Sequence, residues 1–311
     1  MQSNKEHIIV GVGELLWDIF PSGKQLGGAT ANFAYHSALL GNRGIIASRV
    51  GNDALGQEAL LRVEQLGLTT AYIQRDAARP TGTVQVKVDE KGQPDFTITE
   101  DVAWDFMEWT PEWQALATQA DAVCFGSLAQ RSPRSRETIR RFLQATRREA
   151  LRVFDVNLRQ SFFSAAILTE SLRLAQIVKL NDAELPRLMR ILELGDGDDE
   201  EESARLLLKT FDLELVCVTR GAHGSLLVTD TRTVAHPGFS VRVADTVGSG
   251  DAFTAALAHY YLRRASLERI SDAANRLGAW VATQVGATPA VEKDTLRQII
   301  GEKGARSPEL W

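Results

Sequence analysis

The chain is poor in cysteine, in histidine and in basic charge. Its 311 residues include two cysteines and five histidines, and 35 Lys and Arg stand against 40 Asp and Glu, for a formal net charge of -5. Cys124 and Cys217 lie far apart in β-like apolar runs, which favours buried reduced thiols over a disulfide or a nucleophile. The negative balance argues against a broad nucleic-acid-binding face, but a local pocket could still bind a small anion.

Long apolar runs are also missing. No stretch reaches the roughly 20 residues that span a bilayer, and "HIIVGVG" (7–13) is too short for the apolar core of a secretory signal. We therefore expect a soluble, cytoplasmic protein with no membrane partner. The acidic run "DGDDEEE" (196–202) lacks the spacing of a calcium loop and predicts a solvated loop that leads into a helix.

Several common motifs of nucleotide and hydrolase chemistry are absent. There is no G-x-x-x-x-G-K-[ST] phosphate loop, and the "GVG" at 11–13 is followed by Leu16, where a dinucleotide fingerprint needs its third glycine. H-E-x-x-H, paired C-x-x-C and G-x-S-x-G are also missing. The five histidines are scattered, and the sequence favours structural or exposed roles for them.

What the chain does have is a regular alternation of short apolar runs and helical patterns. A strand is predicted at 7–13, a helix at 29–41, a strand at 45–51 and a helix at 54–67, and the rhythm continues in the second half. Strands that alternate with helices predict βαβ units and a mainly parallel sheet covered on both faces, the α/β class.

Two segments interrupt this rhythm. Residues 14–28 hold a Pro-Ser-Gly turn between apolar pieces. Residues 81–104 alternate in polarity, with Val84, Val86 and Val88 on one face and a turn at Glu90–Pro94, which predicts an antiparallel hairpin. The hairpin could cover a pocket as a flap or simply extend the sheet edge, and the pattern does not decide between the two.

The most informative stretch is "DTVGSGDAF" (245–253). Apolar residues recur after it at helical spacing, which predicts an amphipathic helix with the glycine turn at its N-terminus. Unpaired main-chain N–H groups and the positive end of the helix dipole meet at such a turn. Because Gly248 and Gly250 lack Cβ atoms, an anion can approach the main chain closely.

Asp251 follows this turn directly. A carboxylate in the first turn of a helix can take a proton from an attacking hydroxyl, although an isolated aspartate there would only complement the helix dipole. Because the turn and the carboxylate are contiguous, we favour a functional role. Together they suit the transfer of a phosphoryl group.

This stretch also carries a resemblance to a known family. "DTVGSGDAFTAAL" matches the signature D-T-x-G-x-G-D-x-F of the ribokinase-like, or PfkB-type, carbohydrate kinases, and the resemblance, closest to fructokinases, extends over nearly the whole chain. It implies one kinase domain over residues 1–311 with a ribokinase-like three-layer α/β/α fold, a mainly parallel central sheet and a small β-sheet lid from about 14–27 and 81–104. It implies ATP-dependent phosphorylation of a sugar hydroxyl, with Asp251 as the catalytic base and Gly248, Ser249 and Gly250 as the anion hole.

The resemblance also implies a sugar site. "GELLWD" and "GGATANFAYHSALLG" resemble the substrate half of the family. "FDVNLR" resembles the D-x-N-x-R stretch of fructokinases and ketodeoxygluconate kinases, with Val156 where fructokinases usually have proline. The implied sugar-binding residues are Asp18, Gly27, Gly28, Asn32, Asn157 and Arg159. Carboxylate, carboxamide and open glycine main chain supply the acceptors and donors that polyol recognition requires, although Asn32 outside this motif would read as a helix-surface residue.

The nucleotide side is implied by three further segments. "KLNDAE" resembles the N-x-x-E motif, in which Asn181 and Glu184 organise Mg²⁺ through water and phosphate, and the same residues would also suit a helix cap. "VTRGAHGSLL" and "AANRLGAWVATQVGATPAV" resemble the strand and helix beside ATP. The implied ATP-binding residues are Asn181, Thr219, Arg220, Gly221, Gly224 and Asn275. In some relatives the segment of Asp245 and the Gly286–Ala287 turn hold a monovalent cation such as K⁺.

Fructose is the first choice of acceptor because "GELLWD", "DVNLR" and "KLNDAE" together look most fructokinase-like. Ketodeoxygluconate, ribose and a nucleoside remain alternatives, since one difference in a pocket is worth only a few kcal/mol between similar sugars. A non-catalytic sugar or nucleotide sensor is the alternative from another class, and the intact "GSGD" argues against it. As in many relatives, the β lid could pair with a second subunit, so we expect a homodimer.

Overall fold

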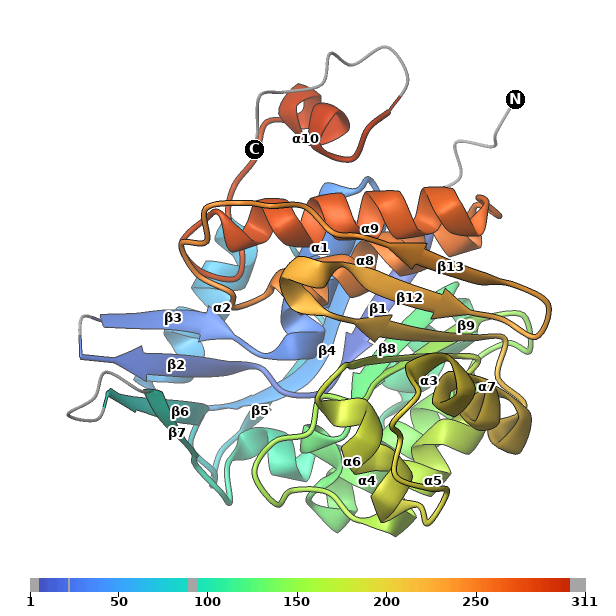
Figure 1. Ribbon diagram of the computed structural model, residues 1–311. Helices are drawn as coiled ribbons and strands as arrows, with labels where there is room; N and C mark the ends of the chain where they lie inside the picture. The colour runs from blue at the N-terminus through green and yellow to red at the C-terminus, as the bar shows by residue number, and fades with distance from the viewer. Residues whose placement is uncertain (1–5, 22, 89–93, 303–311) are drawn as a thin grey trace.

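The computed structural model describes residues 6–21, 23–88 and 94–302, which form two β-sheets and their covering helices (Figure 1). The strands of the main sheet are β1 (Ile8–Val12), β4 (Arg43–Gly51), β5 (Ile73–Asp76), β8 (Ala122–Gly126), β9 (Leu151–Asp155), β10 (Ile177–Asn181), β11 (Leu215–Thr219), β12 (Ser225–Val228) and β13 (Thr233–His236). The helices are α1 (Ala29–Leu39), α2 (Ala54–Gln65), α3 (Pro111–Gln119), α4 (Pro133–Ala145), α5 (Ala165–Leu174), α6 (Glu184–Ile191), α7 (Glu200–Phe211), α8 (Ser249–Leu262), α9 (Leu267–Ala282) and α10 (Lys293–Ile299). Short 3₁₀ turns are η1 (Ala103–Phe106), η2 (Leu128–Gln130) and η3 (Gly221–His223).

The main sheet has nine strands in the order β13-β12-β11-β10-β9-β8-β1-β4-β5. The pairings from β11 through to β5 are parallel, and only β12 and β13 at one edge run antiparallel to their neighbours. All five residues of β8 are buried, as expected for a strand covered on both faces. The predicted mainly parallel α/β sheet is confirmed.

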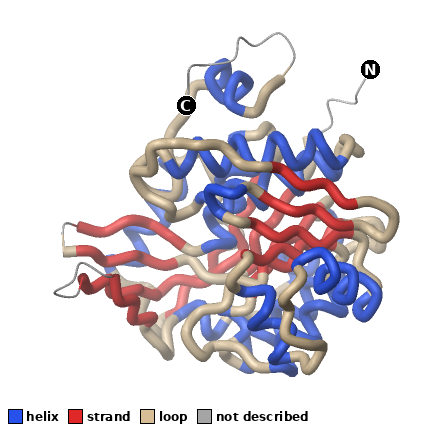
Figure 2. The backbone as a smooth tube through the Cα atoms, in the orientation of Figure 1, coloured by secondary structure: helices blue, strands red, loops and turns tan. Residues whose placement is uncertain are grey.

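Helices cover both faces of this sheet, as Figure 2 shows with blue helices on either side of the red strands. On one face α1, α8 and α9 enclose a core that includes Phe33, Phe253 and Leu277. On the other face α3 to α7 enclose a core that includes Phe142 and Leu188. The predicted three-layer α/β/α arrangement is therefore confirmed.

The helix after the glycine turn differs from its prediction as an amphipathic helix. In α8 the nine consecutive residues Ala252–Tyr260 are all buried. The reason is that α8 packs against both α1 and α9 as well as against the sheet. The apolar spacing predicted the helix correctly. The prediction of an amphipathic helix was wrong, because the small alanines between the large residues are buried as well.

The acidic run leads into a helix, as predicted, but the helix begins earlier than expected. The Asp199 side chain accepts a hydrogen bond from the Glu202 amide and starts α7 at Glu200. Glu200, Glu201 and Glu202 thus form its first turn, where negative charge complements the helix dipole. No helix within the described ranges is long and apolar enough to cross a membrane.

A second, smaller sheet projects from the side of the main body (Figure 1). Its strands are β2 (Leu16–Phe20), β3 (Gly23–Gly27), β6 (Gly82–Val88) and β7 (Pro94–Ile98), in the order β3-β2-β6-β7. β2 and β3 are antiparallel, as are β6 and β7, and β2 joins the two hairpins by pairing parallel with β6. Of the turn predicted at Glu90–Pro94, residues 90–93 lie outside the described residues.

Candidate active site

The residues singled out in the sequence come from several elements that end or begin at the same edge of the main sheet. Asp155, Asn181 and Thr219 are the last residues of β9, β10 and β11, and these strands are parallel. Open parallel sheets present ligand-binding residues at the carboxyl ends of their strands. The N-termini of α1 and α8, capped by Gly28 and Gly248, carry Asn32 and Asp251.

Asn32 and Asp251 meet directly. Asn32 Nδ2 donates a hydrogen bond of 2.8 Å to Asp251 Oδ2, across 219 positions of sequence. Asn32 is only 4% exposed, so it is not the helix-surface residue that its sequence would suggest outside the motif. The contact joins the predicted sugar-binding segment to the predicted catalytic turn.

Burial strongly perturbs the Asp251 carboxyl group. Its pKa is raised from 3.8 to about 6, first by burial and then by the charge of Asp155. The hydrogen bond from Asn32 and the charges of Lys179 and Arg159 oppose this rise. A carboxylate with a pKa about one unit below neutrality is suited to accept a proton and release it again.

Two further carboxyl groups stand close to Asp251. Burial raises the pKa of Asp18 to about 6 and that of Glu14 to about 7. The charge of Arg159 lowers the pKa of both groups, and the charge of Asp251 raises both. The charge of Arg159, an exposed residue, thus acts on all three carboxyl groups, and that of Lys179 acts on Asp251 as well.

The glycine turn has a more constrained geometry than the sequence indicated. Gly248 caps α8 with a φ of 79°, in the left-handed region. A Cβ at Gly248 would lie 2.7 Å from Ala287, and a Cβ at Gly250 would lie 3.1 Å from Lys179 Nζ. The missing Cβ atoms thus make room for protein neighbours as well as for an approaching anion.

The amides of this turn are not equivalent. The N–H and the hydroxyl of Ser249 both donate to the carbonyl of Thr246, at 3.3 and 2.8 Å. Among the residues that the structure describes, the amides of Gly248, Gly250 and Asp251 have no such main-chain acceptor. The donors left over for an anion are therefore Gly248 and Gly250 of the predicted set, together with the amide of Asp251.

The loop beside Gly248 is fastened to α1. Tyr35 Oη donates to the carbonyl of Pro289 at 2.8 Å. His36 Nε2 lies 2.9 Å from the carbonyl of Ala287, and burial lowers the His36 pKa to about 4. The ring is therefore neutral and donates this hydrogen bond.

The N-x-x-E segment forms a reciprocal cap. Glu184 Oε2 accepts from the Asn181 amide at 3.0 Å, while Asn181 Oδ1 accepts from the Glu184 amide at 2.8 Å. Glu184 Oε1 accepts from the Leu158 amide at 2.8 Å, in the loop after β9. The alternative of a helix cap is thus realised, with both carboxylate oxygens of the buried Glu184 accepting main-chain N–H groups.

The predicted ATP-binding turn after β11 is closed by a hydrogen bond of 2.8 Å from the Arg220 amide to the Gly224 carbonyl. Arg220 Nε donates to Glu200 Oε2 at 2.6 Å, so this guanidinium is already paired. Gly221 has a φ of 55° and open space where a Cβ would stand. Thr219 Oγ1 donates a long hydrogen bond of 3.4 Å to the Leu180 carbonyl.

Asn275 and Asp245 also make internal contacts. Asn275 is 7% exposed, and its Nδ2 donates to Ser225 Oγ at 2.7 Å and to the Ser271 carbonyl at 2.8 Å. Asp245 accepts from the amides of Val247 and Gly286 at 3.0 and 3.1 Å. Asp245 thereby ties the glycine turn to the loop at 286–287.

The remaining predicted sugar-binding residues lie beside these groups. A Cβ at Gly27 would be 2.4 Å from Asp18 Oδ2, and one at Gly28 would be 2.3 Å from the Glu14 carbonyl. Asn157 has a φ of 41°, in the left-handed region, directly before the exposed loop of Arg159. The two glycines therefore let the strand of Asp18 pack closely against the start of α1.

Three buried charged residues of this region were missed at the sequence level: Glu14, Asp155 and Lys179. Each stands inside a motif that was quoted for another residue. Glu14 Oε1 accepts from the Ala29 amide at 3.1 Å, at the start of α1. A charged residue within or beside an apolar strand was the available signal.

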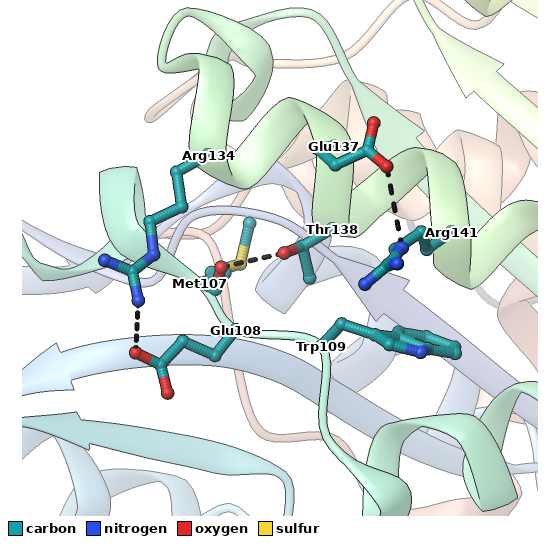
Figure 3. A pocket seen from close by; sticks show the side chains of 7 residues that line it. All are labelled: Met107, Glu108, Trp109, Arg134, Glu137, Thr138 and Arg141. Carbon is teal, nitrogen blue, oxygen red and sulfur yellow. Dashed lines mark hydrogen bonds and ion pairs between the residues drawn. The ribbon is translucent and has the colours of Figure 1, made fainter.

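A separate open concavity of about 410 Å³ lies between α4 and the segment after η1 (Figure 3). Its lining residues are Met107, Glu108, Trp109, Arg134, Glu137, Thr138 and Arg141. Arg134 pairs with Glu108 and Arg141 with Glu137, as the dashed lines in Figure 3 mark. The concavity contains none of the candidate site residues, and its charges neutralise one another.

Comparisons with known proteins agree with this geometry. A family model described as "pfkB family carbohydrate kinase" matches residues 19–294. The chain is 30% identical to a fructokinase from Vibrio alginolyticus over 310 residues, covering 93% of this chain and 98% of that protein. It is 29% identical to a fructokinase from Escherichia coli over 300 residues, covering 90% and 94%.

Solved structures of similar kinases superpose over almost the whole chain. A sugar kinase from Pyrococcus horikoshii in complex with ATP has a TM-score of 0.78 at 27% identity, covering 95% of this chain and 99% of that one. A fructokinase double mutant from Vibrio cholerae, bound to fructose, ADP and a potassium ion, has a TM-score of 0.78 at 27% identity, covering 93% and 96%. The chain therefore belongs to the pfkB family of carbohydrate kinases and is an ATP-dependent sugar kinase.

Proposed function

We propose that the enzyme transfers the γ-phosphoryl group of ATP to a hydroxyl of fructose, with Asp251 as the base. The observation that carries this proposal is the hydrogen bond from Asn32 to Asp251, which puts a polyol-binding amide and a proton acceptor side by side. Fructokinases from Vibrio alginolyticus and Escherichia coli, each similar to nearly the whole chain, support fructose as the acceptor.

In the proposed reaction Asp251 takes the proton of the acceptor hydroxyl. The hydroxyl oxygen forms a bond to the γ-phosphorus while the bond from phosphorus to the β,γ-bridging oxygen breaks, and ADP leaves with that electron pair. The amides of Gly248, Gly250 and Asp251 would stabilise the charge that develops on the phosphoryl oxygens. Ser249 would complete the anion hole by holding the turn through its two hydrogen bonds to the Thr246 carbonyl.

The acceptor would lie between the second sheet and the start of α1. Asp18, Asn32 and Asn157 supply side chains for hydroxyl groups, while Gly27 and Gly28 bring main chain close to the sugar. Arg159 completes the set, and its charge balances the carboxyl groups. Closure of the β lid (14–27 and 81–104) over the sugar would exclude water and limit ATP hydrolysis.

The nucleotide would lie along the ends of β10 and β11, near Thr219, Arg220, Gly221, Gly224 and Asn275. Mg²⁺, when bound, would neutralise phosphate charge, with Asn181 and Glu184 holding its water shell. In the described ranges, no group of three or more His, Cys, Asp or Glu could hold a metal ion, so phosphate and water would have to provide most ligands. Asp245 is the proposed anchor of a K⁺ site through its loop.

A sugar acid such as 2-keto-3-deoxygluconate is the second candidate acceptor. Arg159 is exposed beside the proposed sugar site, and a guanidinium can bind a carboxylate through two parallel hydrogen bonds. Val156, where fructokinases usually have proline, is the one difference from the fructokinase pattern that this stretch shows. The acceptor must therefore be identified by assay.

The test is ADP release measured across fructose, 2-keto-3-deoxygluconate, ribose and a nucleoside, each with ATP and Mg²⁺. Fructose is expected to give the highest kcat/KM. A preference for the sugar acid would move the assignment to the second candidate. Measurable ligand binding without stimulated ADP release by any sugar would favour a sensor.

Asp18→Ala is expected to lower kcat/KM for the sugar by about 10- to 100-fold, because a hydrogen bond to a charged group is worth about 1.5–3 kcal/mol. Its ATP affinity should stay within about threefold of wild type, since Asp18 lies on β2, away from the nucleotide strands. Steady-state kinetics with each substrate varied in turn measure both quantities. Equal losses for sugar and ATP would instead indicate a structural role for Asp18.

Activity is expected to rise with pH through about 6 and to level off above 7. Because the pKa values of Asp251 and Asp18 are both raised to about 6, lowering the pH below that value protonates the proposed base and the proposed sugar ligand. In the pH profile, kcat/KM for the sugar should fall by at least tenfold per unit below about pH 5. A flat profile from pH 5 to 8 would argue against an ionised Asp251 as the base.

The proposal also includes the oligomeric state of the enzyme and its location in the cell. The edges of the small sheet make it the proposed surface for pairing with a second copy of the chain. The substrates are small molecules, ATP and a sugar, which fits a cytoplasmic enzyme.

A further inference from the structure

A buried lysine lies directly behind the glycine turn. Lys179, the third residue of β10, is 8% exposed, and its Nζ is 3.1 Å from both carboxylate oxygens of Asp155 at the end of β9. Lysine is almost never buried unless it is paired, because burial of an isolated ammonium group is costly. This ion pair is therefore a specific feature of the site.

The ammonium group stays charged throughout the working pH range. Burial lowers the pKa of Lys179, but the carboxylates of Asp155, Glu184 and Asp251 raise it by more, so that the net shift is upward. The charge of Lys179 therefore acts on the proposed base Asp251 as well as on its partner Asp155.

The ion pair is attached to the turn at two points. A Cβ at Gly250 would stand 3.1 Å from Lys179 Nζ, so a side chain at this position would press against the ammonium group. Thr254 Oγ1 lies within hydrogen-bond distance of both Asp155 Oδ2, at 3.1 Å, and the Gly250 carbonyl, at 2.9 Å. The main chain of Gly250 is thus held against the pair.

We propose that Lys179 is a positioning residue for phosphoryl transfer: its ammonium group, held by Asp155, fixes the Gly250 turn and keeps a positive charge behind the amides that face the phosphoryl group. This inference rests on the proposed roles of residues 248–251. A fixed charge in a water-poor site acts strongly on charge that develops nearby and needs no reorganisation during the reaction.

The alternative is a pair that only supports the fold, and a double replacement separates the two roles. Replacing a buried ion pair by apolar residues is often neutral or stabilising, whereas removing one partner leaves an uncompensated charge. Lys179→Met should therefore lower Tm, and Lys179→Met with Asp155→Leu should restore it. The double variant should bind ATP within about threefold of wild type but show kcat lowered by about 10²-fold, the scale of one lost electrostatic group.

Asp155→Asn provides a second comparison that does not depend on the double variant. It breaks the same pair but keeps the ammonium group, so kcat should fall much less than in Lys179→Met. Cys217→Ala is the matched packing control, because buried Cys217 stands opposite Lys179 on β11 and carries no charge of the pair. Its kcat should equal that of wild type.

Two results would overturn the inference. One is a double variant with wild-type kcat and Tm, and the other is an equal loss of kcat in Asp155→Asn and Lys179→Met. Failure of the proposed function would look different, because Asp251→Asn would then keep wild-type turnover. An inactive Asp251→Asn beside an active double variant would remove only Lys179 from the mechanism.

Discussion

Asp251→Asn is expected to lower kcat by about 10²–10⁴-fold, the usual contribution of a general base. A carboxamide cannot take the proton of the acceptor hydroxyl, but its oxygen can still accept the hydrogen bond that Asn32 donates at 2.8 Å. The geometry of the site is therefore preserved while the proton acceptor is lost. Steady-state kinetics with saturating sugar and ATP measure the loss directly.

The fold of this variant should be at least as stable as wild type. The folded chain raises the Asp251 pKa from 3.8 to about 6, so any stability that this carboxyl group lends is present below about pH 4 and is lost as the pH rises through 6. At pH 7.5 the ionised form is disfavoured by burial, and asparagine removes that penalty. Thermal unfolding at pH 7.5 should give an equal or higher Tm.

Asp199→Asn is the matched control, because Asp199 also stands at the start of a helix and is bonded to the Glu202 amide. Asparagine caps helices about as well as aspartate, so Tm and kcat should both stay near wild type. Wild-type turnover in Asp251→Asn would show that Asp251, like Asp199, only complements a helix terminus.

Gly248→Ala is expected to reduce turnover by about 10²-fold and to lower stability. With a φ of 79°, alanine at this position would be strained, and its Cβ would stand 2.7 Å from the Cα of Ala287. Main chain cannot rotate away as a flexible side chain can, so the 286–287 loop or the start of α8 must move. A displacement of about 1 Å in a catalytic site can cost this much activity.

Gly67→Ala separates the two causes of this loss. Gly67 has a φ of 76°, nearly the same as that of Gly248, but nothing lies within 4 Å of the place where a Cβ would stand. The Gly67→Ala variant should therefore lose about 1–2 kcal/mol of stability from backbone strain and keep wild-type kcat. Equal kinetic behaviour of the two variants would show that the contact of Gly248 with the loop is unimportant for activity.

The main sheet could be predicted from the sequence because its strands are covered on both faces. Such strands read as short continuous apolar runs, and β8, with five buried residues, is an example. The partner of each hairpin in the second sheet could not be predicted in this way. A period of two assigns residues to faces, but it does not indicate that β2 pairs with β6, and this pairing joins the sheet together.

The parts of the site that consist of residues adjacent in sequence could be predicted. Contacts between residues far apart in sequence could not. The residues of "GSGD" are adjacent, so the helix terminus and its carboxylate could be inferred together. Lys179 meets Asp155 across 24 positions, and Asn32 meets Asp251 across 219. The sequence therefore explained Gly250 by anion approach alone, whereas in the structure the ammonium of Lys179 stands where a Cβ would point.

The hydrogen bonds from Tyr35 and His36 to the loop at 287–289 have a thermodynamic consequence. In the proposed site, α1 offers Asn32 to the sugar. One turn further on, the same helix holds the loop that touches Gly248, which the proposal places beside the phosphoryl group. Sugar binding that shifts α1 would also shift the loop beside Gly248 and so change the affinity for ATP. Linkage makes this effect reciprocal. Whatever factor the sugar imposes on the dissociation constant of ATP, ATP imposes on that of the sugar.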